Sequence, residues 1–188
     1  MNDLHIDDLI SSAVSGDVDA YEQIIKLYEK KVFNLALRYV KNRDDALDVS
    51  QEVFLQIYQN LDQFRGESQF STWVYRVTYN KCVDMLRKLQ KTQRNVVMST
   101  DDENFFESAS GKNSLEQEYE NRELLNTVMA AIDTLPQEQR DVVHLRYIKD
   151  LSYAQIAEIL NIAEGTVKSR INRARLKIKE ISDYQGTK

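Results

Sequence analysis

The last third of the chain reads Leu151-Ser-Tyr-Ala-Gln-Ile-Ala-Glu-Ile-Leu160, then Asn161-Ile-Ala-Glu-Gly165, then Thr166-Val-Lys-Ser-Arg-Ile-Asn-Arg-Ala-Arg-Leu-Lys-Ile-Lys179. Apolar residues recur at helical spacing in the first and last parts. Ser152 is suited to cap the first helix, because a serine hydroxyl can accept a hydrogen bond from a backbone N–H. A short helix, a turn and a basic helix in this order are typical of a helix-turn-helix. The stretch therefore predicts two helices that pack on each other through apolar faces.

The second of these helices has a basic outer face. No acidic residue occurs from Thr166 to Lys179. At about 100° per residue, the side chains opposite the apolar face are those of Lys168, Ser169, Asn172 and Arg173. Arg and Asn can pair with guanine and adenine edges, whereas Lys can hold phosphate groups. The face is predicted to bind DNA, and the alternative is a solvated cationic surface helix.

The composition favours an all-α protein. Only five Gly and one Pro occur among 188 residues, and 42% of the residues are hydrophobic, which is enough for real cores. A single Cys excludes an intrachain disulfide, and two distant His, His5 and His144, leave no zinc-ligand spacing. No apolar run approaches the ~18 residues of a membrane span, so we expect a cytoplasmic protein.

Charge is segregated along the chain although the net charge is −5. The stretch 71–94 and the helix-turn-helix are basic, whereas 101–123 is strongly acidic. Helical periodicity lapses over 92–113, where Asn, Ser, Thr, Asp and Gly concentrate. We therefore predict two small helical domains, residues 1–91 and 114–188, joined by a flexible acidic linker over 92–113.

The helix predicted over 44–61 has a leucine on its polar side. A broad apolar arc is formed by Ala46, Leu47, Val49, Val53, Phe54, Ile57, Tyr58 and Leu61. The opposite side gathers Asp44, Asp48, Gln51, Glu52 and Gln59, with Leu55 in their midst. Such a leucine is either a neutral surface residue or the apolar anchor of a protein interface with an acidic rim. The residues alone leave both interpretations open.

The helix predicted over 70–89 has an unusual stripe of Trp73, Arg76, Asn80, Asp84 and Arg87. The loop before it offers Phe64, Arg65 and Gly66. Aromatic, amide and guanidinium groups together suit unstacked single-stranded bases, because each base has a π-face and a hydrogen-bonding edge. The alternative is that Trp73 packs on a neighbouring element while Asp84 pairs with Arg87 or Lys88.

Three motifs in order now carry a family resemblance. The runs Asp45-Ala-Leu-Asp-Val-Ser-Gln-Glu-Val-Phe54, Phe70-Ser-Thr-Trp73 and Glu164-Gly-Thr-Val-Lys168 resemble those of bacterial extracytoplasmic-function (ECF) sigma factors. Nearly the whole chain is covered. The resemblance implies a dissociable subunit that gives core RNA polymerase its promoter specificity, without enzymatic activity, cofactor or metal of its own. It also implies an anti-sigma factor, often membrane-bound, as a further partner.

The resemblance also implies roles for the surfaces already described. The N-terminal domain corresponds to sigma region 2 and the C-terminal domain to region 4, and the linker would thread the RNA exit channel. The polymerase-binding residues implied are Asp48, Gln51, Glu52 and Leu55. The residues implied for opening and capturing the minus-ten element are Phe64, Arg65, Trp73, Arg76, Tyr79, Asn80 and Arg87. The residues implied for reading the minus-thirty-five element are Glu164, Thr166, Lys168, Ser169, Arg170, Asn172 and Arg173.

Two positions depart from the family pattern. Leu47 stands where an acidic residue is usual, which puts an interface role of that side chain in doubt. Ala163 precedes the recognition helix where relatives have Ser or Pro, so this cap should be weaker by about 1 kcal/mol than a serine cap.

Two other functions fit parts of the sequence. A two-domain transcriptional regulator would bind duplex DNA without polymerase, as a dimer on palindromic sites. A protein-interaction adaptor would show no salt-dependent DNA affinity at all.

Overall fold

The computed structural model describes residues 3–93, 128–147 and 151–185. Every regular element in these ranges is helical and none is a strand, which confirms the all-α prediction. The chain divides into two compact units, which are described separately below. The linker predicted over 92–113 lies outside the described residues except for its first two positions.

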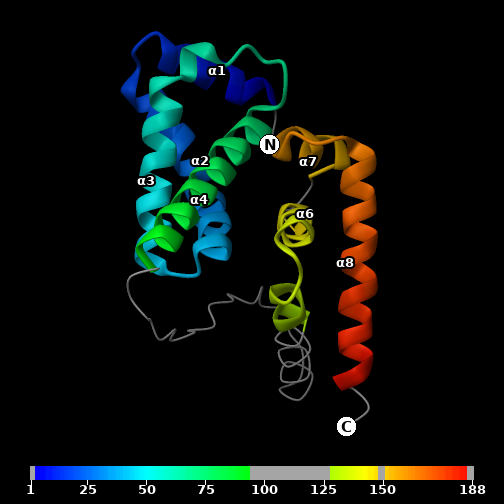
Figure 1. The fold of residues 1–188 in the computed structure, drawn as a ribbon. Coiled ribbons are helices and arrows are strands. Elements are labelled where there is room, and N and C mark those ends of the chain that lie inside the picture. The colour runs from blue at the N-terminus through cyan, green and yellow to red at the C-terminus, as the bar shows by residue number, and fades with distance from the viewer. Residues whose placement is uncertain (1–2, 94–127, 148–150, 186–188) are drawn as a thin grey trace, which may run out of the picture. The chain divides into compact units, whose positions relative to one another are not determined.

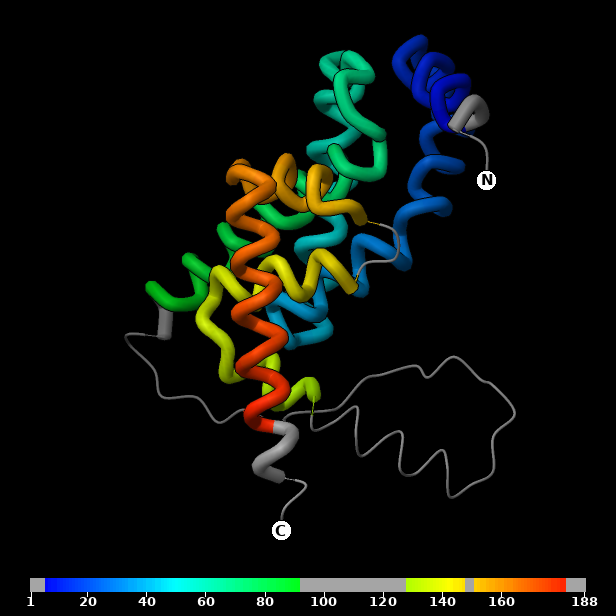
Figure 2. The backbone as a smooth tube through the Cα atoms, turned by 90° about the vertical axis from the view of Figure 1, so that its right-hand side faces the viewer, coloured from blue at the N-terminus to red at the C-terminus, as the bar shows by residue number. Residues whose placement is uncertain are grey.

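The N-terminal unit is a helical bundle. It consists of α1 (Asp3–Val14), α2 (Val18–Val40), α3 (Arg43–Gln59), the 3-10 turn η1 (Leu61–Gln63) and α4 (Phe70–Gln93). Helix α2 contacts α1, α3 and α4, and α3 also contacts α4. The three long helices α2, α3 and α4 therefore enclose the core (Figures 1 and 2). Fully buried side chains include those of Ile24, Val32, Leu35, Ile57 and Val74. Burying each contributes about 1.5–3 kcal/mol.

A tight connection sets α3 against α2. Lys41 follows α2 in the left-handed conformation (φ 57°), which ends the helix. The Asn42 side chain then caps α3 by accepting hydrogen bonds from the backbone amides of Asp44 and Asp45 at 2.9 and 3.0 Å. Helix α3 ends at Gln59, two residues before the predicted end, and Leu61 is buried in η1 instead.

The apolar arc predicted on α3 is too broad. Ala46, Val49 and Val53 are buried, but Leu47 is 43% exposed and Tyr58 is 53% exposed. Helices α2 and α4 cover only the centre of the arc. The Tyr58 ring makes a tilted contact with the Tyr21 ring of α2, with 4.9 Å between centroids, at the edge of the interface between the two helices. Two large apolar side chains are therefore left on the outer surface of α3.

The C-terminal unit contains a helical segment over 128–133, followed by α6 (Gln137–Tyr147), α7 (Tyr153–Leu160) and α8 (Glu164–Gln185). Its core cluster is formed by Ile132, Leu135, Val143 and Ala174. Helix α6 contacts α8, and α7 lies across the N-terminal end of α8 in both ribbon views (Figures 1 and 2). The long helix α8 is therefore held by short helices along one side.

The helix-turn-helix geometry arises from local hydrogen bonds. The Ser152 hydroxyl accepts a bond from the Gln155 amide at 3.2 Å, and the Gln155 side chain accepts one from the Ser152 amide at 2.7 Å. This reciprocal capping box confirms Ser152 as the cap of α7. Asn161 then adopts a left-handed conformation (φ 52°), and the Ile162 amide donates to the Ala157 carbonyl. The turn thus ends α7 sharply and directs the chain into α8.

Candidate functional site

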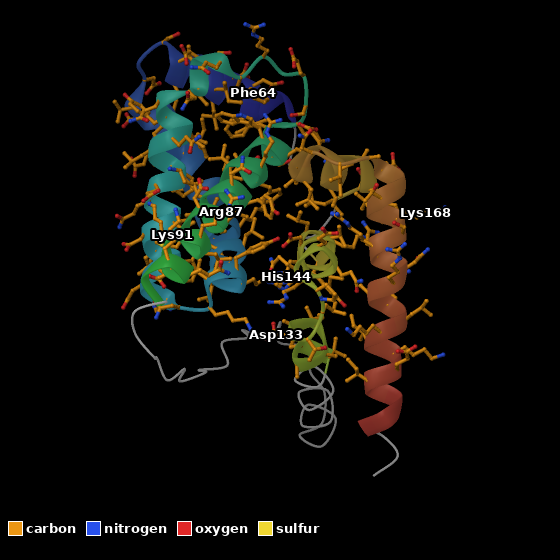
Figure 3. All side chains as sticks on the ribbon, in the orientation of Figure 1. Phe64, Arg87, Lys91, Asp133, His144 and Lys168 are labelled. Atoms are coloured by element: carbon orange, nitrogen blue, oxygen red, sulfur yellow. The ribbon has the colours of Figure 1, made fainter. Side chains whose placement is uncertain are left out.

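Helix α8, predicted to be the DNA-recognition helix, has distinct buried and exposed faces. Val167, Ile171 and Ala174 are buried, as the apolar periodicity predicts. The exposed side chains among the predicted DNA contacts are Glu164, Lys168, Asn172 and Arg173. Lys168 lies near the N-terminal end of α8 (Figure 3), the end of a helix that favours anions. These four side chains are therefore open to solvent on the outer face of α8.

The other predicted contacts on α8 are partly covered. Arg170 donates to the Glu138 carboxylate of α6 at 2.7 Å, and its side chain is only 20% exposed. The Ser169 hydroxyl donates to the Thr166 carbonyl at 2.9 Å, and both residues are half-buried. Arg170 therefore ties the recognition helix to α6 in this structure, instead of extending toward solvent.

The loop between α3 and α4 brings three aromatic rings together. Phe64, from the loop, lies 5.2 Å from Phe70 and 5.6 Å from Trp73, measured between ring centroids, and Phe70 lies 5.6 Å from Trp73. Figure 3 shows Phe64 beside this loop. Phe70 is buried, whereas Phe64 and Trp73 are half-buried and so keep part of their surface open. Gly66 has φ +70° with no atom within 4 Å of an added Cβ, so its backbone geometry favours glycine while the space around it is free.

The polar stripe of α4 is partly engaged within the unit. Arg87 pairs with Asp84 at 3.4 Å, as the alternative interpretation expected, and both side chains are well exposed. Tyr79 packs edge-on against Tyr39 of α2, with centroids 5.6 Å apart, and is half-buried, as is Arg76. Asn80 is exposed, as is Arg65 of the preceding loop. Asn80 thus presents an exposed amide on the same helix as Trp73, about two helical turns further along.

The outer surface of α3 combines acidic and apolar groups. Asp48, Gln51 and Glu52 are exposed as predicted, and Leu55 among them is 61% exposed. Leu47 and Tyr58, which the sequence analysis assigned to the core, flank the same surface. Their spacing could have revealed this, because residues 47, 51, 55 and 58 follow at intervals of four, four and three and fall on one helical stripe. We call the following exposed residues of this helix the α3 surface: Leu47, Asp48, Gln51, Glu52, Leu55 and Tyr58.

Negative charge is concentrated where α3 begins. Burial raises the pKa of Asp45, and the neighbouring charges of Asp48 and Asp44 raise it further. Burial is the larger cause, and the smaller contribution of the two neighbouring carboxylates shows that negative charges crowd this end of α3. The α3 surface therefore suits a partner that brings positive charge to its rim.

Cys82 is fully buried, and burial raises the pKa of its thiol to about 12, so it remains protonated at neutral pH. Cys82 is therefore a small core residue. Within the described ranges, no three His, Cys, Asp or Glu side chains gather as metal ligands would. No helix in those ranges has both the length and the apolar character needed to cross a membrane.

Two family models match the chain in the order of its two units. Residues 24–92 match Sigma-70 region 2, and residues 125–178 match Sigma-70, region 4. The chain is 37% identical to the ECF RNA polymerase sigma factor SigW of Bacillus subtilis (strain 168), over 88% of this chain and 90% of that protein. It is 36% identical to the ECF RNA polymerase sigma-E factor of Escherichia coli (strain K12), over 89% of this chain and 88% of that protein.

Solved structures share the fold. CnrH, in complex with the cytosolic domain of CnrY, superposes with a TM-score of 0.67 at 24% identity, over 94% of this chain and 96% of that chain. The sigma factor RpoE of Bartonella quintana, in complex with the anti-sigma factor NepR, gives a TM-score of 0.69 at 22% identity, over 88% of this chain and 98% of that chain.

Proposed function

Because the chain belongs to the ECF RNA polymerase sigma factors, we propose that it binds core RNA polymerase and directs promoter recognition, strand opening and transcription initiation. The observation that carries this proposal is that α8 and α4 each expose basic and amide side chains, while α3 separately exposes Leu55 among acidic and amide groups. A regulator that binds duplex DNA without polymerase needs only the α8 face. We further propose that residues 1–91, 92–113 and 114–188 act as region 2, linker and region 4.

Each surface takes one task in this proposal. The α3 surface docks on the polymerase, with Leu55 as its apolar anchor and Asp48, Gln51 and Glu52 as its rim. The aromatic loop and α4 capture the minus-ten strand through Phe64, Arg65, Trp73, Arg76, Asn80 and Arg87. Helix α8 reads the minus-thirty-five element through Glu164, Lys168, Asn172 and Arg173. Ser169, Arg170 and Tyr79 act mainly by positioning these elements, since their side chains contact the protein itself. Thr166 contributes the backbone carbonyl that accepts the hydrogen bond from Ser169.

The chain supplies binding energy for strand opening and leaves the bond chemistry to the polymerase. Extruding a base from the duplex costs a few kcal/mol. Stacking a base on an aromatic side chain returns about 1–3 kcal/mol. The rings of Phe64 and Trp73 already contact each other, so little ordering cost is added when a base arrives.

The proposal extends to the cell biology of the protein. The chain acts in the cytoplasm, where core RNA polymerase and promoter DNA are found. An anti-sigma factor holds it inactive by covering surfaces that the polymerase needs. This partner is inferred from the family, in which such complexes are common.

Run-off transcription tests the function directly. Genomic DNA from the source organism is sheared and transcribed by purified core polymerase with and without this chain. We expect discrete new transcripts that depend on the chain and whose start sites identify its promoters. Silence of the polymerase, together with a shift of duplex DNA by a dimer of the chain alone, would instead support the polymerase-independent regulator.

Replacing Asn80 with Ala is expected to weaken strand opening more than polymerase recruitment. The exposed amide can bond a base edge only after the base has left the stack, so its loss acts at the opening step. Permanganate reactivity of the minus-ten thymines should fall several-fold, while co-purification with polymerase is unchanged. Asn34→Ala, on the exposed side of α2, is the matched control. Equal reactivity in Asn80→Ala and wild-type complexes would remove Asn80 from the opening step.

Arg173 and Arg170 are expected to behave differently when each is replaced by Ala. Arg173 is exposed, so its loss should cost about 1–3 kcal/mol of discrimination at one base pair. Arg170 is engaged with Glu138, so its loss should lower the unfolding free energy by no more than about 1 kcal/mol and leave base preference intact. Binding to a panel of minus-thirty-five duplexes separates the two, and a changed base preference in Arg170→Ala would contradict this assignment.

A further inference from the structure

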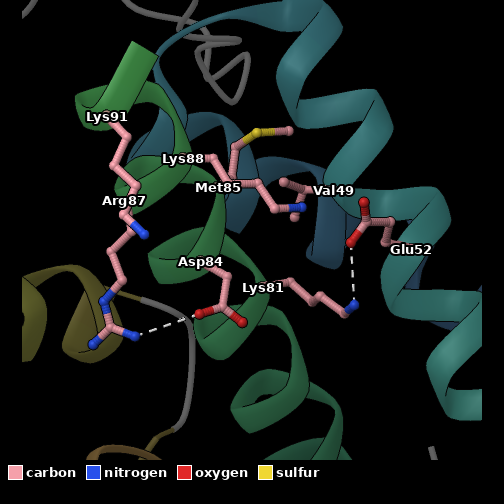
Figure 4. A pocket seen from close by; sticks show the side chains of 8 residues that line it. All are labelled: Val49, Glu52, Lys81, Asp84, Met85, Arg87, Lys88 and Lys91. Atoms are coloured by element: carbon pink, nitrogen blue, oxygen red, sulfur yellow. Dashed lines mark hydrogen bonds and ion pairs between the residues drawn. The ribbon is translucent and has the colours of Figure 1, made fainter. Parts of the chain in front are cut away.

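A cationic pocket of about 260 Å³ lies between α3 and α4 (Figure 4). Its α4 wall carries Lys81, Arg87, Lys88 and Lys91, and two carboxylates, Glu52 of α3 and Asp84 of α4, also line it. Figure 4 shows Lys81 and Lys88 extending from α4 toward α3. Four cations around two carboxylates leave an excess of positive charge that fits an anionic ligand.

The Glu52–Lys81 ion pair joins this pocket to the α3 surface. The Lys81 ammonium lies 3.1 Å from the Glu52 carboxylate, and the two side chains are 27% and 46% exposed. Both residues also line a second hollow of about 410 Å³, which includes Leu55 and Gln56 of α3. Glu52 is therefore shared between the cationic pocket and the surface proposed to meet the polymerase. A partner that engages its carboxylate must do so in competition with Lys81.

We propose that the α3–α4 pocket binds a backbone phosphate of promoter DNA, and that Glu52 withholds Lys81 from this phosphate until the polymerase docks on the α3 surface. This inference rests on the proposed function and adds a link between its two steps. A phosphodiester is the anion that DNA brings to α4, and a lysine ammonium binds it as a point charge. Once polymerase groups pair with Glu52, the Lys81 ammonium is released to the pocket.

The energetics of the pair suit such an exchange. A partly exposed ion pair contributes little stability, so Lys81 can change partners at small cost. Linkage requires that the coupling be reciprocal, so DNA in the pocket must also favour polymerase docking. Breaking one exposed ion pair of this kind is expected to change the affinity of the chain for DNA about two- to fivefold. The free chain is thus held at lower DNA affinity than the polymerase-bound chain.

The test measures binding of the full-length chain alone to a fluorescein-labelled 20-base-pair duplex by anisotropy at several salt concentrations. Glu52→Gln should raise affinity about two- to fivefold and steepen the slope of log affinity against log salt by about 0.9, the value for one added phosphate contact. The matched control is Glu22→Gln, which removes the same charge and frees Lys26 from its 2.7 Å ion pair on α2. That control should leave the slope unchanged.

A second variant isolates the lysine. Adding Lys81→Met to Glu52→Gln should return the slope to the wild-type value, with thermal unfolding by circular dichroism confirming that both variants fold. The inference is overturned if Glu52→Gln matches Glu22→Gln, or if the gain survives Lys81→Met. Run-off transcription with the wild-type chain is scored in parallel. Chain-dependent transcripts without a slope change would refute the pocket and leave the sigma function intact.

Discussion

Replacing Leu55 with Asp is expected to abolish binding to core RNA polymerase while leaving the fold intact. The side chain is 61% exposed and lies among Asp48, Gln51 and Glu52, so no core contact is lost. At the centre of an interface, an apolar anchor is worth 2 kcal/mol or more, and a buried unpaired carboxylate adds a further penalty. At about 1.4 kcal/mol per tenfold change, binding should weaken by at least about thirtyfold.

Competition for core polymerase checks this expectation. Unlabelled Leu55→Asp chain is titrated against a fluorescently labelled wild-type chain bound to polymerase. Leu176→Asp is the matched control, because Leu176 is 64% exposed on α8, far along the chain from the α3 surface. The control should compete like the wild-type chain. If Leu55→Asp competes equally well, Leu55 is not part of the interface, whatever the transcription assays show.

Replacing Leu135 with Ala is expected to destabilise the C-terminal unit by about 2–5 kcal/mol, through lost burial and the cavity left behind. Leu135 is 1% exposed in the cluster with Ile132, Val143 and Ala174, which holds α8 in place. Since whole domains are stable by only about 5–15 kcal/mol, this loss should cost the unit much of its folded population on mild denaturation. Recognition of the minus-thirty-five element should fail with it.

The single Trp makes this prediction specific to one unit. Trp73 lies in the N-terminal unit, so its fluorescence follows that unit alone, whereas far-ultraviolet circular dichroism follows the helices of both. In urea, Leu135→Ala should shift part of the dichroism transition to lower concentration and leave the fluorescence midpoint unchanged. Leu176→Ala should shift neither. An equal shift of both signals would show that the two units unfold as one.

The helix-turn-helix could be predicted from sequence because its determinants are local. Ser152 and Gln155 are three residues apart and cap α7 through each other, and the burial of Val167 and Ile171 follows directly from helical periodicity. The exposure of Leu55 was predictable for the same reason. Such features depend on spacing within one helix, which the sequence displays.

Other features depend on residues far apart in the chain and could not be read from spacing. The exposure of Leu47 is decided by how much of α3 the neighbouring helices cover. Helical spacing predicts Arg170 as an outward DNA contact, but its side chain is directed to Glu138, 32 residues earlier in the chain. Tyr79 is likewise held by Tyr39 of α2. In each case a tertiary contact determined which of two plausible directions the side chain takes.

The division of α8 into separate faces has a consequence for how such proteins diversify. The side chains that hold the helix, Val167, Ile171 and Ala174, share no position with the exposed Lys168, Asn172 and Arg173. Substitutions on the exposed face therefore cost little folding energy, because surface changes usually fall within about 0.5 kcal/mol. Duplicated copies of one gene can acquire new promoter preferences through a few such changes, without first acquiring compensating mutations in the core.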